Sequence, residues 1–136
     1  MKSLLTLSLL LLGVLAPGQV ARPFDPPAER WLPGHRGVDL VAHLDQEVVS
    51  PAPGRVIYAG PLVDRSVISV ELASGLRLTF EPVTPIVQVG EAVERGQVLG
   101  RMATSGSLHW GAKYPGDQYV DPLALTLGPI RLKSWP

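Results

Sequence analysis

The middle of the chain alternates between apolar and polar residues. Leu76, Leu78 and Phe80 fall on one side of an extended segment, and the polar residues between them fall on the other side. Successive side chains of a β-strand point to opposite faces, so this alternation predicts a strand with one buried and one exposed face. Residues 66–72 alternate in the same way. The Ala-Ser-Gly sequence at 73–75, between the two segments, is typical of a hairpin turn.

The rest of the pattern also favours strands over helices. Short runs of β-branched residues are bounded by turn residues, and no segment shows a sustained apolar period of 3.6 residues. The 14 glycines and 14 prolines argue against a helical bundle. We therefore predict one all-β domain, a compact antiparallel β-sandwich or barrel, with at most one helical turn near residues 117–127.

The first 21 residues have the pattern of an export signal. Lys2 supplies a positive charge, residues 4–15 are almost wholly apolar, and small residues follow. A helix over the apolar run would rise about 18 Å, which is short of the roughly 30 Å of a bilayer core. We expect a signal peptide over residues 1–21, cleaved after Gly18 or Ala21, and no stable membrane span after cleavage. An uncleaved N-terminal anchor is the alternative.

The remaining chain divides into three expected parts. Residues 22–34 are rich in proline, which fixes φ and removes a hydrogen-bond donor, so we expect an extended lead-in with little regular structure. Residues 35–128 hold the predicted β domain. Residues 129–136 form a C-terminal tail.

Charge and cysteine content exclude several function classes. Lys plus Arg and Asp plus Glu both total 12, so the chain lacks the broad positive field that nucleic-acid binding requires, and we expect no nucleic-acid partner. The absence of cysteine excludes disulfides, thiolate metal sites and a cysteine nucleophile. A metal site in this chain must therefore use its three histidines and its carboxylates.

His35 and Asp39 lie four residues apart and could bind a metal. A neutral imidazole and a carboxylate suit a borderline ion such as Zn²⁺. A third ligand has to come from elsewhere, and His43 and His109 are the imidazole candidates. Three protein ligands with one open position are typical of a catalytic zinc site. The spacing alone leaves open that His35 is a surface histidine beside an aspartate.

Six segments follow one another in an order that carries more information than any one of them. They are residues 35–40 (HRGVDL), 54–60 (GRVIYAG), 74–80 (SGLRLTF), 89–100 (VGEAVERGQVLG), 108–110 (LHW) and 121–123 (DPL). In this order they resemble the lysostaphin-type zinc endopeptidases, which are peptidoglycan hydrolases. The resemblance covers about residues 33–125. It implies the β fold of that family (the duplicated hybrid motif kind) and one zinc ion per chain held by His35, Asp39 and His109.

Residues 89–100 taken alone also resemble the hairpin of biotinyl and lipoyl carrier domains. Those carriers are modified on a lysine in a tight turn. The lysines of this chain are Lys2, Lys113 and Lys133, and none lies in such a turn. We therefore interpret the segment as structural.

Two further histidines of the family have no counterpart here. The resemblance places them at Pro82 and Ser107. In the family they position the attacking water, transfer its proton and stabilise developing charge. Proline has no ionisable side chain and a serine hydroxyl is a poor base at neutral pH. Because loss of one general base typically costs about 10²–10⁴-fold in rate, the sequence supports zinc binding more strongly than turnover.

Glu81 and His43 are the two candidates for a replacement base. Strand alternation places residue 81 on the face opposite to residues 80 and 82, so we expect that a bend or bulge at Pro82 would have to redirect Glu81. A solvated glutamate on a strand face is the alternative. His43 lies in the loop after Asp39, where a surface histidine is the simpler interpretation.

Two functions follow from the resemblance and its departures. The first is a secreted, periplasmic or cell-envelope bacterial protein that binds zinc, does not catalyse, and binds peptidoglycan stem peptides or regulates a cell-wall hydrolase. The second is an active zinc metalloendopeptidase that cleaves peptidoglycan peptides with a rearranged general base.

Overall fold

A computed structural model describes residues 20–29 and 31–125 of the 136-residue chain. The apolar run expected to be a signal sequence and the expected C-terminal tail lie outside the described residues. Residues 124 and 125 are helical at the end of the described chain, and the other regular elements are strands. These are β1 (Val20–Arg22), β2 (Gly37–Ala42), β3 (Glu47–Val49), β4 (Gly54–Leu62), β5 (Arg65–Glu71), β6 (Arg77–Glu81), β7 (Val83–Pro85), β8 (Ala92–Val93), β9 (Val98–Met102), β10 (Gly106–Tyr114) and β11 (Gln118–Tyr119).

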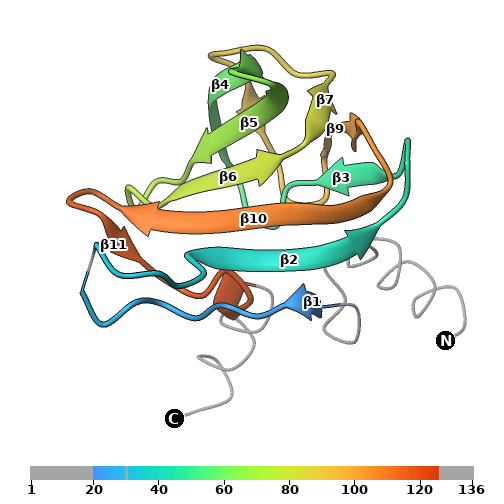
Figure 1. The fold of residues 1–136 in the computed structure, drawn as a ribbon. Coiled ribbons are helices and arrows are strands. Elements are labelled where there is room, and N and C mark those ends of the chain that lie inside the picture. Colours follow the sequence, from blue (N-terminus) through green and yellow to red (C-terminus); the bar gives the residue numbers. More distant parts are fainter. Residues whose placement is uncertain (1–19, 30, 126–136) are drawn as a thin grey trace, which may run out of the picture.

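The strands form two antiparallel sheets, as Figure 1 shows. The larger sheet has the order β1-β2-β10-β6-β5-β4-β8, with β11 paired to β10. The smaller sheet has the order β3-β9-β7. β10 joins the two parts of the large sheet. It comes late in the chain, yet it pairs with β2 on one side and with β6 on the other. This topology confirms the predicted all-β antiparallel fold and places distant segments of the sequence side by side.

The apolar core lies on one face of the large sheet. β2, β5, β6 and β10 direct alternate side chains into it, and the small sheet contributes from the other side. Trp110 and Phe80 are fully buried there and stack with ring centroids 6.1 Å apart. The core residues without solvent exposure include Val38, Leu40, Val48, Ile68, Val70, Leu78, Phe80, Val83, Leu99, Leu108 and Trp110.

The alternation predicted for residues 76–81 is present in the structure. Leu78 and Phe80 are buried, and Arg77, Thr79 and Glu81 are not. Gly75, in the turn before this strand, has a φ of 90°, which glycine adopts without steric cost. The opposite face of the large sheet is therefore free to carry polar side chains.

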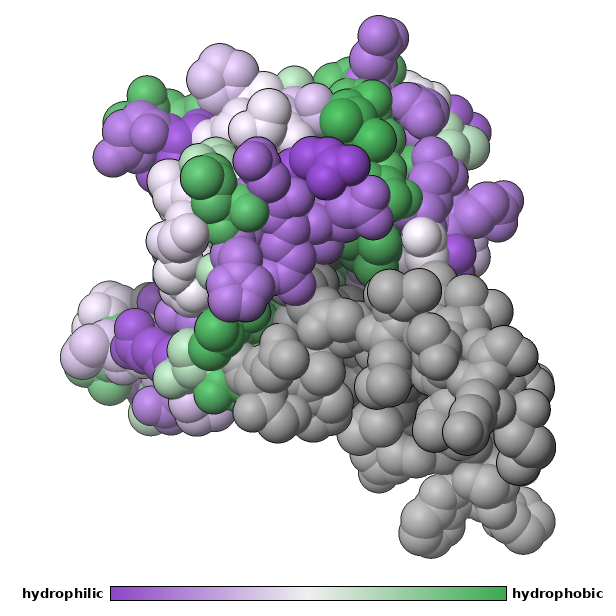
Figure 2. Space-filling view, turned by 90° about the vertical axis from the view of Figure 1, so that its right-hand side faces the viewer, coloured by the Kyte–Doolittle hydropathy of each residue, from purple (hydrophilic) through white to green (hydrophobic). Residues whose placement is uncertain are grey.

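Exposed hydrophobic residues are interspersed with polar ones on the surface. On the side shown in Figure 2, hydrophilic residues gather in the middle and hydrophobic residues lie on both sides of them. The large hydrophobic residues that are exposed in loops and turns include Trp31, Leu44, Val63, Ile86 and Val89. In the part of the chain that the structure describes, no helix has the length and apolar character needed to cross a membrane.

Candidate metal centre

Strand register brings Asp39 and His109 together. Asp39 on β2 and His109 on β10 are directly paired across the two antiparallel strands, although 70 residues separate them. Their neighbours Leu40 and Trp110 are buried in the core, so strand alternation directs Asp39 and His109 to the outer face of the sheet. The core residues of the two strands thus determine where these polar side chains point.

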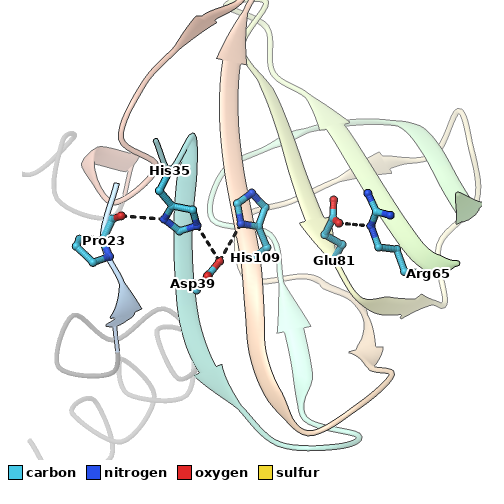
Figure 3. A network of polar contacts seen from close by, with 6 residues as sticks. All are labelled: Pro23, His35, Asp39, Arg65, Glu81 and His109. Atoms are coloured by element: carbon cyan, nitrogen blue, oxygen red, sulfur yellow. Dashed lines mark hydrogen bonds and ion pairs between the residues drawn. The ribbon is translucent and has the colours of Figure 1, made fainter. Parts of the chain in front are cut away.

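His35 completes the group from the segment just before β2. Its Nε2 lies 3.2 Å from Oδ1 of Asp39, and Nδ1 of His109 lies 2.8 Å from the same oxygen. The two imidazole rings are 5.2 Å apart at an angle of 62°. Figure 3 shows both rings turned toward the carboxylate between them. The three residues that the resemblance implies as ligands are therefore brought together.

The second ring nitrogen of His35 contacts the backbone. Nδ1 lies 2.8 Å from the carbonyl oxygen of Pro23. Both partners of the ring are acceptors, because a carbonyl oxygen and an ionised carboxylate can only accept; with a metal bound, Nδ1 would donate to Pro23 and the Nε2 lone pair would be left for the metal. That lone pair faces the carboxylate of Asp39. Two acceptors that face each other are well satisfied by a cation between them, so this donor set fits a metal ion.

His35, Asp39 and His109 each offer one potential ligand atom, and these three atoms lie within 4.8 Å of one another. Two imidazole nitrogens and one carboxylate oxygen are ligands that zinc accepts in sites with an open fourth position. His35 is only 6% exposed, whereas Asp39 and His109 are partly exposed. The centre is thus anchored on one side and open to solvent on the other.

A groove of about 910 Å³ runs over the centre and includes all three residues in its wall. Pro82 and Ser107 also line it. The two positions to which the resemblance assigns the missing histidines therefore border the same groove as the metal group, and neither carries an imidazole.

Glu81 lies in the same wall, and the reason differs from the one expected. Glu81 on β6 is the direct cross-strand partner of His109 on β10, so both side chains point to the outer face. Phe80 points the opposite way, into the core. Ordinary strand alternation therefore places Glu81 beside the centre, and no redirection at Pro82 is needed. The chain nonetheless bends at Pro82, between β6 and β7, so Pro82 lines the same groove as Glu81.

Arg65 is a groove residue that the sequence analysis missed. Its Nε donates to Oε1 of Glu81, and its guanidinium also pairs with Asp64. The hydrogen bond to Glu81, more than the one to Asp64, raises the pKa of Arg65 above its ordinary value, so the arginine stays charged. No local motif marks this pair, because residues 65 and 81 come together only through the β5–β6 pairing.

His43 lies apart from the residues that line this groove. It is exposed in the loop between β2 and β3, where its backbone N–H donates to the side chain of Gln46. Its proposed role as a base remains a prediction from the sequence.

A second groove of about 800 Å³ shares His109 and Glu81 with the first. It continues along the outer face of the sheet to Tyr119, whose ring lies 5.7 Å from the guanidinium carbon of Arg36 and 5.9 Å from Nζ of Lys113. The metal group therefore lies where two grooves meet, with space for an extended ligand on either side.

The sequence matches Peptidase family M23 over residues 33–122, which is more than half of the chain. The chain belongs to Peptidase family M23. An uncharacterized protein of Mycobacterium tuberculosis (strain H37Rv) is 41% identical over 128 residues, covering 86% of this chain and 51% of that protein. A protein of Mycobacterium bovis matches equally well. The chain thus spans about half the length of the curated relatives it matches.

Solved structures with the M23 fold are similar throughout the β domain. The catalytic domain of lysostaphin, an antimicrobial peptidase from Staphylococcus simulans, has a TM-score of 0.67 at 20% identity, covering 79% of this chain and 91% of that domain. Csd3 from Helicobacter pylori has a TM-score of 0.66 at 27% identity, covering 79% of this chain and 30% of Csd3. These similarities confirm the fold that the motif order implies.

Proposed function

We propose that this M23 protein is secreted, binds one zinc ion and acts at the bacterial cell wall as a non-catalytic peptidoglycan-binding or hydrolase-regulating protein. One observation carries the proposal. The His35, Asp39 and His109 group is complete, whereas Pro82 and Ser107 occupy the positions in the same groove that would need histidines. The expected domain organisation, with a leader over residues 1–21 and the β domain over 35–128, is part of this proposal.

The role of each groove residue follows from its chemistry. His35, Asp39 and His109 would hold zinc, which supplies Lewis acidity toward a carbonyl oxygen when bound. Ser107 can donate or accept a hydrogen bond but is a poor proton acceptor at neutral pH. Pro82 offers only its ring and a backbone carbonyl. The groove can therefore bind and orient a peptide carbonyl, with little capacity to move a proton.

Peptidoglycan stem peptides are the proposed ligand class, and a cell-wall hydrolase is the alternative partner. The support is membership of a peptidase family, together with the two grooves that adjoin at His109 and Glu81. Peptide carbonyls and amides can pair with polar side chains in the groove walls, such as Ser107, Ser69 and Thr79. The family's substrate class gives peptidoglycan priority over other peptides.

Two measurements on purified protein that begins after Gly18, so that β1 (Val20–Arg22) is kept, test the proposal. Metal analysis should find about one zinc per chain, and a sacculus pull-down should show zinc-dependent binding without release of new amino termini. His109→Ala is the variant without a ligand, and it should lose both zinc and zinc-dependent binding. Zinc-dependent release of amino termini by the native chain, absent in His109→Ala, contradicts the non-catalytic role.

The active endopeptidase is the second candidate, and the position of Glu81 favours it. Glu81 is paired in register with His109 and lines the groove. Its Oε1 accepts from Arg65, which leaves Oε2 to take a proton from a water near the centre. If this candidate holds, Glu81→Gln should abolish release of amino termini and leave zinc content unchanged.

A double variant separates the two candidates further. Pro82→His combined with Ser107→His returns an imidazole to each position. If proton transfer is what the native groove lacks, the double variant should release amino termini from sacculi where the native chain does not. Native activity equal to that of the double variant would favour the active enzyme.

A further inference from the structure

A segment before the family match contacts the metal group. Residues 20–27, here called the N-terminal strap, run beside β2, and the match to family M23 begins only at residue 33. Val20 pairs with Leu40, and Arg22 pairs with Asp39. Farther along, Asp25 and His35 exchange two backbone hydrogen bonds of 2.8 and 2.7 Å. The strap is therefore held against β2 on both sides of the metal ligands.

The strap reaches the imidazole of His35 through one atom. The carbonyl oxygen of Pro23 accepts from Nδ1 of His35 at 2.8 Å, and the His35 side chain is 8% exposed. Figure 3 shows Pro23 and Asp39 on opposite sides of the His35 ring, so each ring nitrogen has a separate partner. With zinc bound, the bond to Pro23 would keep the hydrogen on Nδ1 and leave the Nε2 lone pair for the metal.

We propose that the N-terminal strap is a positioning element of the metal centre, and that the Pro23 carbonyl sets the ring orientation and tautomer of His35. The proposal rests on zinc binding at this group, as stated under Proposed function. Partners of the non-ligating nitrogen of a metal-bound histidine typically affect metal affinity by about 10–100-fold when they are changed. The expected lead-in thus has a specific role that its proline-rich sequence does not reveal.

A substitution at Gly34 can displace the strap without replacing any of the three metal-binding residues. A Cβ at this position would lie 2.7 Å from the carbonyl oxygen of Asp25 and 2.9 Å from Cδ of Pro27. The nearest contacts are with the strap, including its backbone, so Gly34→Ala should displace the strap from His35. Gly111 is the matched control, because its Cβ would lie 3.7 Å from the carbonyl oxygen of Arg36 and 3.8 Å from Nε2 of His109, which are ordinary contacts away from the strap.

The experiment measures zinc affinity by chelator competition and the His35 tautomer by nitrogen-15 NMR of the metal-free protein. In the native protein we expect a hydrogen on Nδ1, directed at Pro23, whether or not Nε2 also donates to Asp39. Gly34→Ala should lose about 10–100-fold in zinc affinity and give a mixture of the two His35 tautomers. Gly111→Ala should keep the native affinity and tautomer. A purely structural role of the strap would leave the tautomer of a folded variant unchanged.

Phe24→Ala is a second variant that perturbs the strap, for use if Gly34→Ala does not fold. Phe24 packs against the apolar core from within the strap, so its truncation should loosen the strap and shift both readouts in the same direction. A folded strap variant with native affinity and native tautomer overturns the proposal. So does a loss of affinity without a tautomer change, or an equal loss in Gly111→Ala.

The tautomer readout separates this inference from the proposed function. If the native protein binds no zinc, the proposed zinc function fails. The metal-free tautomer of His35 still decides whether the strap sets the ring. A tautomer that depends on the strap supports the positioning role, and a tautomer that does not depend on it contradicts that role.

Discussion

The two sides of the groove differ in how firmly the fold holds their side chains. On the metal side, Asp39 and His109 extend from adjacent strands whose neighbouring residues are buried, and His35 is 6% exposed. On the opposite side, the Arg65 side chain is 42% exposed, and Val63 at the tip of the β4–β5 hairpin is 93% exposed. The ligands are supported by the core, whereas the facing residues lie on a hairpin edge.

This difference predicts that substitutions on the two sides have different consequences. A change at a ligand disturbs residues that the core and the strap both position. A change on the facing side alters exposed groups that solvent can accommodate. We therefore expect metal binding to respond to substitutions on the metal side and to tolerate those on the facing side, and the following variants test this.

Asp39→Ala should have the largest effect on metal binding. Both imidazoles approach the same oxygen of this carboxylate, so its removal takes away a ligand and the group that lies between the other two. Zinc content should fall from about one per chain to a trace. Elemental analysis after dialysis checks this, and retention of a full equivalent would show that the metal lies elsewhere.

Gly37→Ala should weaken the metal side by crowding. A Cβ at Gly37 would lie 2.6 Å from the carbonyl oxygen of Trp110 and 2.9 Å from Nε2 of His109. Overpacking of this kind typically costs about 1–3 kcal/mol, and displacement of the His109 ring should also lower zinc affinity. Denaturant unfolding with and without zinc measures both effects. Native stability and affinity together would mean that the ring has room to move.

Val63→Gly should stabilise the facing side slightly. Val63 has a φ of 60° in the turn between Leu62 and Arg65, a conformation that is costly for a β-branched residue. Relief of about 1–2 kcal/mol is partly offset by the greater freedom of glycine in the unfolded chain, so the net gain should be about 0.5 kcal/mol. Thermal unfolding tests the sign, and a lower melting temperature would contradict strain at this position.

Glu81→Gln should have the smallest effect on metal binding and stability. The Arg65 side chain is 42% exposed and that of Glu81 is 20% exposed, and the glutamine oxygen can still accept from Arg65, so little is lost. Zinc content and melting temperature should stay close to native values. A large loss of zinc in this variant would place Glu81 among the ligands and would remove the distinction between the two sides.

The sequence by itself determined the strands and the kinds of residues available at the centre. The alternation of Leu76, Leu78 and Phe80 with polar residues depends only on neighbouring positions, so it predicted β6 and its buried face. The order of the motifs pointed to His35, Asp39 and His109, because a motif is recognised from its residue types and their spacing, without knowledge of the contacts in the fold. β7 was not recognised, since Pro82 and Pro85 border so short a strand.

Only the tertiary structure decided which residues face one another. Alternation states that Glu81 and Phe80 point in opposite directions, but the pairing of β6 with β10 determines that Glu81 lies beside His109. The pairing of β5 with β6 likewise brings Arg65 to Glu81, and the strap places the Pro23 carbonyl on His35. Strand pairing depends on contacts between distant segments and on the packing of a shared core, which local patterns of residues do not contain.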